Sequence, residues 1–232
     1  LDAYAHTSSV PPGMRLIPGI ELSSRWRKQG VHIVGLNIDL SNPVMASAVA
    51  EQSSIRLQRA QEISVRLERL GFDGCLEGAQ RFAHNQIGRP HFAQHLIAVG
   101  AVKNSNEAFK KYLGAGKAGD IKEHWPDIET VVQWIKQAGG IAVLAHPSKY
   151  KMTRTKLTEL IGDFKNAGGE AMEVVSGLQI PSLTRDLAKL CTQFGLLASC
   201  GSDFHSPDKK WAALGLISNL PETCKPIWDR WS

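Results

Sequence analysis

Between residues 127 and 217, helical patterns that end in glycine alternate with short apolar runs, and this alternation restricts the fold more than any other feature. The pattern predicts helices over 127–138, 153–167 and 182–194, and strands over 141–145, 171–175, 196–200 and 212–217. Strands that alternate with helices are typical of a parallel sheet, and continuously apolar strands indicate burial on both faces. The sequence therefore predicts an α/β fold.

Polar residues gather at or just beyond the C-terminal ends of the expected strands. They are Glu21, His146, Ser176, Asp203 and His205. In parallel α/β folds this edge of the sheet is where active sites are built. The Asp oxygen and the His nitrogen of Asp203 and His205 suit a divalent metal, although the Gly-Ser-Asp sequence here is also typical of a turn.

Two earlier segments, 15–23 and 31–36, also predict strands. Strand alternation places Glu21 on the opposite face from its apolar neighbours, and on this segment alone it fits a solvent-facing carboxylate. His32 shares a face with Val34, and on its own it fits a hydrogen-bonded core histidine better than a ligand. Neither residue identifies a site by itself.

The segment 44–125 predicts helices and loops without a clear strand. We therefore expect an α/β domain formed by residues 1–43 and 126–232, with residues 44–125 as a mainly helical insertion. Within the insertion, Arg89 stands at the start of a short expected helix. A guanidinium beside a helix N-terminus suits a phosphate group, so Arg89 is a candidate for binding an anionic substrate.

Composition sets outer limits on function. The 232 residues are 43% hydrophobic and 21% charged, which is ordinary for a globular protein, and the formal net charge of +5 permits an anionic substrate. The four cysteines show no CxxC spacing, which fits a reducing compartment. Without a membrane-spanning run or a secretory signal, we expect a cytoplasmic protein with no membrane partner and no obligate protein partner.

Five short motifs together resemble one family. They are IPGIELS at 17–23, VHIVG at 31–35, GRPH at 88–91, AHP at 145–147 and GSDFH at 201–205. Their order and spacing resemble the PHP (polymerase and histidinol phosphatase) domain. Within it they most resemble the branch of nucleoside 3′,5′-bisphosphate phosphatases and short-RNA 5′-exonucleases. Each motif is weak alone, but the combination spans most of the chain.

The resemblance implies a distorted (β/α)₇ TIM-like barrel of PHP type with a helical insertion and two or three divalent metal ions at its rim. It implies that the metal ligands are Glu21, His32, His146, Asp203 and His205, and that Glu21 bridges the ions. The catalytic residues would be Glu21, His146, Asp203 and His205. It also implies that Arg89 and His91 hold a substrate phosphate. Mixed His and carboxylate ligands suit manganese, with iron, zinc or magnesium as alternatives.

One departure from the family pattern affects the expected fold. The family opens with a strand that carries His-x-His, followed by a second strand that ends in Thr-Asp-His-Asp, and neither motif is present here. The one histidine before His32 is His6, which has no such context. We therefore expect this chain to lack the first two strands of the barrel, and to be inactive or nearly so alone.

The predicted function is that of a metal-dependent phosphoesterase that acts on nucleoside 3′,5′-bisphosphates or on the 5′ ends of short RNA. Phosphate ester hydrolysis needs a hydroxide nucleophile and neutralised phosphoryl oxygens, and paired divalent ions supply both. Two alternatives remain open at this point. One is a histidinol-phosphatase-like phosphomonoesterase, and the other is a metal-poor PHP-like scaffold that binds a partner.

Overall fold

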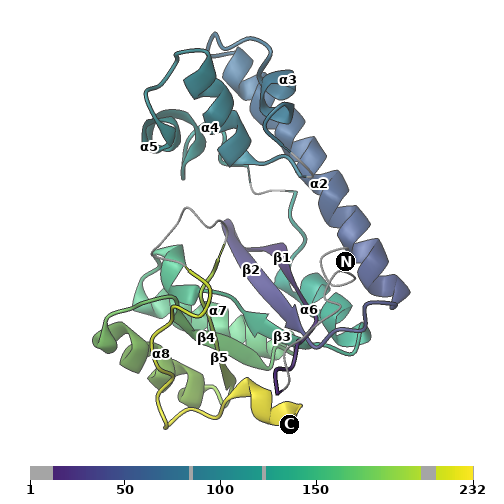
Figure 1. The fold of residues 1–232 in the computed structure, drawn as a ribbon, viewed down its shortest axis with the longest axis vertical. Coiled ribbons are helices and arrows are strands. Elements are labelled where there is room, and N and C mark those ends of the chain that lie inside the picture. Colours follow the sequence, from purple (N-terminus) through teal and green to yellow (C-terminus); the bar gives the residue numbers. More distant parts are fainter. Residues whose placement is uncertain (1–12, 84–85, 122–123, 205–212, 232) are drawn as a thin grey trace. The chain divides into compact units, whose positions relative to one another are not determined.

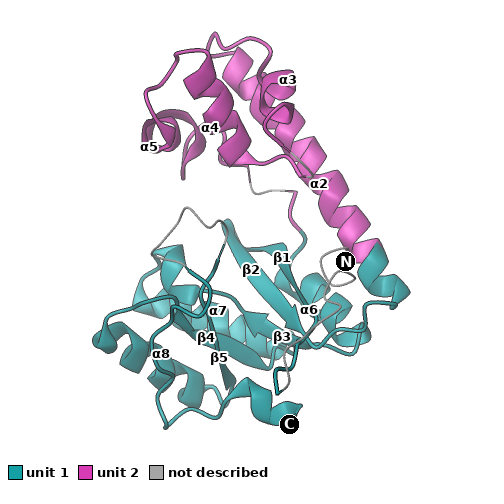
Figure 2. Ribbon diagram, in the orientation of Figure 1, with its two compact units in different colours: residues 1–46, 126–232 teal, residues 47–125 magenta. Residues whose placement is uncertain are grey.

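The computed structural model describes residues 13–83, 86–121, 124–204 and 213–231. The chain forms two compact units, which Figure 2 distinguishes by colour. Unit 1 consists of residues 1–46 and 126–232, and unit 2 consists of residues 47–125.

Unit 1 is built on a five-stranded sheet with the strand order β1-β2-β3-β4-β5 (Figure 1). The strands are β1 (Gly19–Trp26), β2 (Gln29–Leu36), β3 (Ile141–Leu144), β4 (Ala171–Ser176) and β5 (Leu197–Gly201). Strands β3, β4 and β5 pair in parallel, as the alternation from residue 127 predicts. Strands β1 and β2 form an antiparallel hairpin, and β2 also pairs antiparallel with β3, so the sheet is mixed.

The expected strand over 212–217 is wrong for its described part. Residues 213–217 contain no strand, and a turn lies at Leu214 and Gly215. Gly215 has a φ of +74°, a left-handed conformation that a side chain disfavours. The apolar composition of this run therefore does not reflect strand pairing.

Three helices follow the predicted alternation in unit 1. They are α6 (Ile128–Gln137), α7 (Arg154–Asn166) and α8 (Pro181–Gln193). Helix α6 begins after Asp127, whose Oδ1 accepts a hydrogen bond from the Thr130 N–H at 2.9 Å. The described part of unit 1 also contains two short 3₁₀ helices, namely η2 (Pro147–Tyr150) and η4 (Ile227–Arg230).

The two faces of the sheet differ. On one face Gly35 of β2 lies against α6 so closely that an added Cβ would be 3.0 Å from Ile135. On the other face Val34 packs against a buried cluster formed by Val143, Ala171 and Ile227. Alternation along β2 places His32 on this second face, nearer to the start of the strand. The second face is therefore apolar at one end and polar at the other.

Unit 2 is helical in its described part. Helix α2 (Pro43–Glu68) belongs to it from residue 47 onwards. The elements that follow are α3 (Cys75–Gln80), α4 (Arg89–Ala98), α5 (Ser105–Ala108) and the π-helical turn η1 (Phe109–Leu113). Its core includes Leu67, Phe92 and Leu96, all fully buried. No helix in the described ranges is long and apolar enough to cross a membrane.

Candidate metal centre

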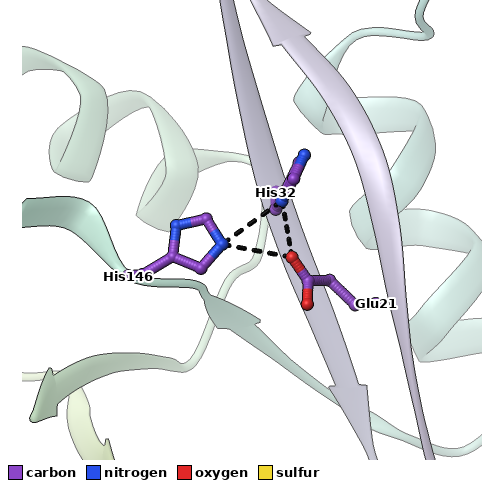
Figure 3. A group of neighbouring side chains, drawn as sticks. All are labelled: Glu21, His32 and His146. Carbon is purple, nitrogen blue, oxygen red and sulfur yellow. Dashed lines mark hydrogen bonds and ion pairs between the residues drawn. The ribbon is translucent and has the colours of Figure 1, made fainter. Parts of the chain in front are cut away.

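Three side chains of unit 1 converge on one point at the polar end of the sheet (Figure 3). The Nδ1 atom of His32 lies 2.5 Å from Oε1 of Glu21, and Nε2 of His146 lies 3.1 Å from the same oxygen. The two histidine nitrogens are 3.2 Å apart. Among the described residues these three form the one group of at least three potential ligands whose donor atoms all lie within 4.8 Å of one another.

Strand pairing explains how the three residues meet. In the β1–β2 hairpin Ser23 pairs with His32 and Glu21 pairs with Val34, so Glu21 and His32 are diagonal neighbours on one face. Because β2 runs antiparallel to β3, the first half of β2 lies beside the C-terminal end of β3. The Ala145 N–H donates to the His32 carbonyl at 3.1 Å, which places His146 next to this pair.

The expected position of Glu21 at a strand end is wrong. Glu21 is the third residue of β1, and the strand continues to Trp26. Its side chain still reaches the polar end of the sheet because it extends diagonally towards His32. The orientation of β2 also explains why His32, which is far from the C-terminal end of its own strand, belongs to this edge.

The electrostatics favour an ionised carboxylate beside the two imidazoles. Burial acts to raise the pKa of Glu21, but hydrogen bonds and positive charge from His146 and His32 outweigh it and hold the pKa well below its usual range. Burial acts to lower the pKa of His146, and the neighbouring carboxylates, Glu21 first, raise it above its usual value. The group thus presents one ionised carboxylate beside two imidazoles, and a bound cation would replace any proton that His146 carries.

His146 is held in an uncommon backbone conformation. Its φ of +28° lies between the end of β3 and the start of η2, where an L-residue is strained. Its N–H donates to Oε2 of Glu173 at 2.6 Å, which stabilises this conformation. The ring also contacts Tyr150, with the ring centroids 5.5 Å apart.

Glu173 is a residue of the site that the sequence analysis missed. It lies in the middle of β4, on the strand that pairs with β3 and β5. Burial raises its pKa above the usual value, although the His146 N–H opposes this shift. The available signal was a single carboxylate inside an otherwise apolar run, which is costly to bury without a partner.

The donor set fits a divalent metal. Two imidazole nitrogens and one carboxylate oxygen are the ligand types that zinc, iron and manganese accept. The three donor atoms can form mutual hydrogen bonds only if a ring nitrogen carries a proton, whereas a cation would satisfy all three lone pairs at once. A metal therefore fits the geometry and the chemistry of this group.

Asp203 and His205 are placed differently by the structure. Asp203 follows β5 with a φ of +52°, and its Oδ2 pairs with the Nζ atom of Lys149. It is not part of the group of three. His205 lies outside the described residues, so its predicted role stays a prediction. Ser176, also expected at this edge, ends β4, and its Oγ is buried without a partner among the described residues.

Arg89 and His91 both lie in unit 2, at the start of α4. A guanidinium nitrogen of Arg89 lies 3.2 Å from the Leu113 carbonyl and 3.4 Å from Oδ1 of Asp120. The Nδ1 atom of His91 accepts a hydrogen bond from the Gly88 N–H at 2.9 Å. Their predicted contact with a substrate phosphate therefore stays a prediction.

Comparisons with characterised proteins give close relatives. The chain is 40% identical over 226 residues to a 5′-3′ exoribonuclease of Haemophilus influenzae, covering 97% of this chain and 82% of that protein. It is 41% identical over 228 residues to a 3′,5′-nucleoside bisphosphate phosphatase of Chromobacterium violaceum, covering 97% of this chain and 80% of that protein. A scan against protein-family models finds no match.

Two solved structures share the fold. One is described as an amidohydrolase from Chromobacterium violaceum with bound sulfate and no metal. Its TM-score is 0.82 at 42% identity, over 92% of this chain and 75% of that chain. The other, from Bifidobacterium adolescentis, is described as a metal-dependent phosphoesterase, with a TM-score of 0.73 at 25% identity over 91% of this chain and 75% of that chain.

The fold, the metal-compatible group and these relatives define a metal-dependent phosphoesterase with an α/β fold. Within that class, the chain belongs to the PHP family, as the five short motifs indicated.

Proposed function

We propose that this protein hydrolyses phosphate esters of nucleoside 3′,5′-bisphosphates, of the 5′ ends of short RNA, or of both. The observation that carries the proposal is the convergence of Glu21, His32 and His146 at the polar end of the sheet. The names of the two relatives support the substrate class, because one is a bisphosphate phosphatase and the other an exoribonuclease.

Bound divalent ions would supply a hydroxide at neutral pH and neutralise charge on the phosphoryl oxygens. The residues of the chain prepare the centre for them. Glu21 offers an ionised carboxylate between two imidazoles, and His146 presents Nε2 because its backbone is fixed by Glu173. The ammonium group of Lys149 pairs with the carboxylate of Asp203, the residue proposed below as a further ligand.

The finer assignments belong to the same proposal. We take Asp203 and His205 as additional ligands or catalytic groups, and Arg89 and His91 as groups that hold a substrate phosphate. Manganese is the proposed metal, with iron, zinc or magnesium as alternatives, because the described donors mix nitrogen and oxygen. The five-stranded sheet would form part of a distorted (β/α)₇ barrel, interrupted by residues 44–125.

Phosphate release in manganese tests the proposal directly. With the full-length protein, we expect turnover of adenosine 3′,5′-bisphosphate and of 5′-phosphorylated short RNA, and little turnover of histidinol phosphate. His146→Ala and Asp203→Ala should each abolish hydrolysis with little loss of stability, because both residues lie beyond strand ends. His124→Ala, at an exposed histidine paired with Glu62, is the matched control.

The same experiment separates the alternatives. Preference for histidinol phosphate would favour a histidinol-phosphatase-like enzyme. A folded protein that binds no manganese and releases no phosphate would favour a metal-poor scaffold. The nucleotide and RNA activities of the relatives make both outcomes unexpected.

A further inference from the structure

A groove of about 540 Å³ lies in unit 1, between the turn that joins β1 to β2 and the segment that leads from η2 into α7. It is lined by Trp26, Arg27, Lys28, Gln29, Tyr150, Lys151, Met152, Thr153 and Lys156. This set, drawn from the described residues, contains four basic side chains and no acidic one. The groove therefore suits a ligand with repeated negative charge.

Three of the basic residues supply most of the charge that a ligand would meet. Lys28, Lys151 and Lys156 are exposed, and no ion pair is recorded for them within the described ranges. Arg27 is different, because its guanidinium lies 2.5 Å from a carboxylate oxygen of Glu159. The three lysines are thus available to an anion without breaking a pair.

Tyr150 joins this groove to the metal centre. Its ring contacts His146, and its hydroxyl accepts a hydrogen bond from the His32 N–H at 2.9 Å. The same residue lines the groove. A ligand whose terminal phosphate reaches the metal centre can therefore continue past Tyr150 towards the three lysines.

The groove offers charge rather than a stacking surface. Trp26 is only 6% exposed, its Nε1 donates to Asp163 at 2.7 Å, and Arg27 covers its ring at 4.3 Å. A base cannot stack on this ring unless Arg27 leaves. Contacts to phosphates carry no sequence information, whereas base stacking on aromatic rings is what holds bases in many single-strand sites.

We propose that this groove binds the phosphate backbone of a single-stranded oligonucleotide, downstream of the nucleotide whose 5′ phosphate lies at the metal centre. Recognition is by charge through Lys28, Lys151 and Lys156, and it is independent of base sequence. The inference rests on the proposed function for its direction along the strand, but the binding itself can be measured without hydrolysis.

The test compares two triple variants that remove the same charge. The first is Lys28→Ala with Lys151→Ala and Lys156→Ala, and the control is Lys136→Ala with Lys189→Ala and Lys225→Ala, at exposed lysines of unit 1 outside the groove. The probe is a 5′-phosphorylated six-nucleotide RNA with a 3′ fluorophore, and its anisotropy is measured without added metal to prevent hydrolysis. Thermal melting checks that each variant is folded.

We expect the groove variant to bind the RNA about tenfold or more weakly, and the slope of log K against log salt to fall by about two, given roughly 0.7 per phosphate contact for single strands. The control should bind like wild type. A Lys→Arg triple at the groove positions should restore binding. RNA sequences of different base composition should bind alike.

Three results would overturn the inference. The first is an equal loss of RNA affinity in the groove and control variants. The second is unchanged RNA affinity in the groove variant. The third is that the wild-type protein binds an oligoglutamate peptide of the same charge as tightly as it binds the RNA. A different result would separate the two proposals. If the protein binds RNA through the three lysines but releases no phosphate, the proposed function is contradicted and the groove assignment still holds.

Discussion

The backbone N–H of His32 donates a hydrogen bond to the hydroxyl of Tyr150 at 2.9 Å. The same hydroxyl lies 2.7 Å from the carbonyl of Ala145, the residue before His146. One side chain therefore bridges the backbones next to both histidines of the metal centre. Removing a group that positions a metal ligand typically lowers metal affinity by about 10–100-fold.

Tyr150→Phe should weaken the metal centre and the fold together. The variant keeps the ring contact with His146 but leaves the N–H of His32 and the carbonyl of Ala145 without this partner. We expect a loss of about 1–3 kcal/mol in unfolding free energy, together with weaker manganese binding. Urea unfolding and calorimetric metal titration measure the two effects. Tyr112→Phe, at a tyrosine in ring contact with Phe72 in unit 2, is the control, and equal values for both variants would contradict the bridging role.

Glu173→Ala should reduce metal affinity by about 10–100-fold, which is typical when a group that orients a ligand is removed. The reason is that the His146 N–H loses the acceptor that fixes its strained backbone. Glu173→Gln retains an acceptor oxygen and should recover most of the affinity. Glu170→Ala, which removes a carboxylate paired with Arg230, is the control in manganese titration. No difference between the Ala and control variants would show that Glu173 has no positioning role.

Arg89→Ala should raise KM for the bisphosphate more than it lowers kcat. A guanidinium that holds a non-reacting phosphate contributes to ground state and transition state alike. Steady-state kinetics give the comparison, and Arg66→Ala, at an arginine paired with Glu62, is the control in the same unit. If KM stays unchanged while unit 2 becomes less stable, the role of Arg89 is structural, through its contacts with Leu113 and Asp120, and the phosphate-binding role is contradicted.

Asp127→Ala should lower the free energy of unfolding by about 1 kcal/mol, the typical contribution of an N-terminal helix cap. The Thr130 N–H lowers the pKa of Asp127 in the folded protein. Its contribution is therefore present above the unfolded pKa, about 3.9, and is lost as the pH falls through the lower folded value. Urea unfolding between about pH 7 and pH 3 measures this loss. Asp127→Asn retains a capping oxygen, and its unfolding free energy should depend less on pH. If wild type and Asp127→Asn show the same dependence of unfolding free energy on pH, the role of the Asp127 carboxylate as a titrating cap is contradicted.

The sequence predicted those features that depend on local pattern. The helices and strands from residue 127 to residue 201 lie within one or two residues of their expected bounds, because glycine stops and apolar runs mark them directly. His146 was identifiable because it follows a buried strand and precedes proline. The family resemblance, rather than any local pattern, gave Glu21 and His32 their expected roles.

Features that depend on long-range pairing were missed. The antiparallel direction of β2 beside β3 has no local signal, so the position of His32 at the polar edge could not be deduced from its own strand. Glu173 looked like part of an apolar strand because the partner that justifies its burial lies on the preceding strand. The Lys149–Asp203 pair joins residues 54 positions apart, and neither residue alone predicts the other.

The β1–β2 hairpin also has a consequence for the order of folding. Two of the three converging donors, Glu21 and His32, lie on strands joined by a two-residue turn, so they can meet on the microsecond timescale of hairpin formation. The third, His146, is 114 residues beyond His32 and must wait for β3 to dock. During synthesis, the chain would therefore hold only two of the three donors together until β3, the central strand, pairs with β2.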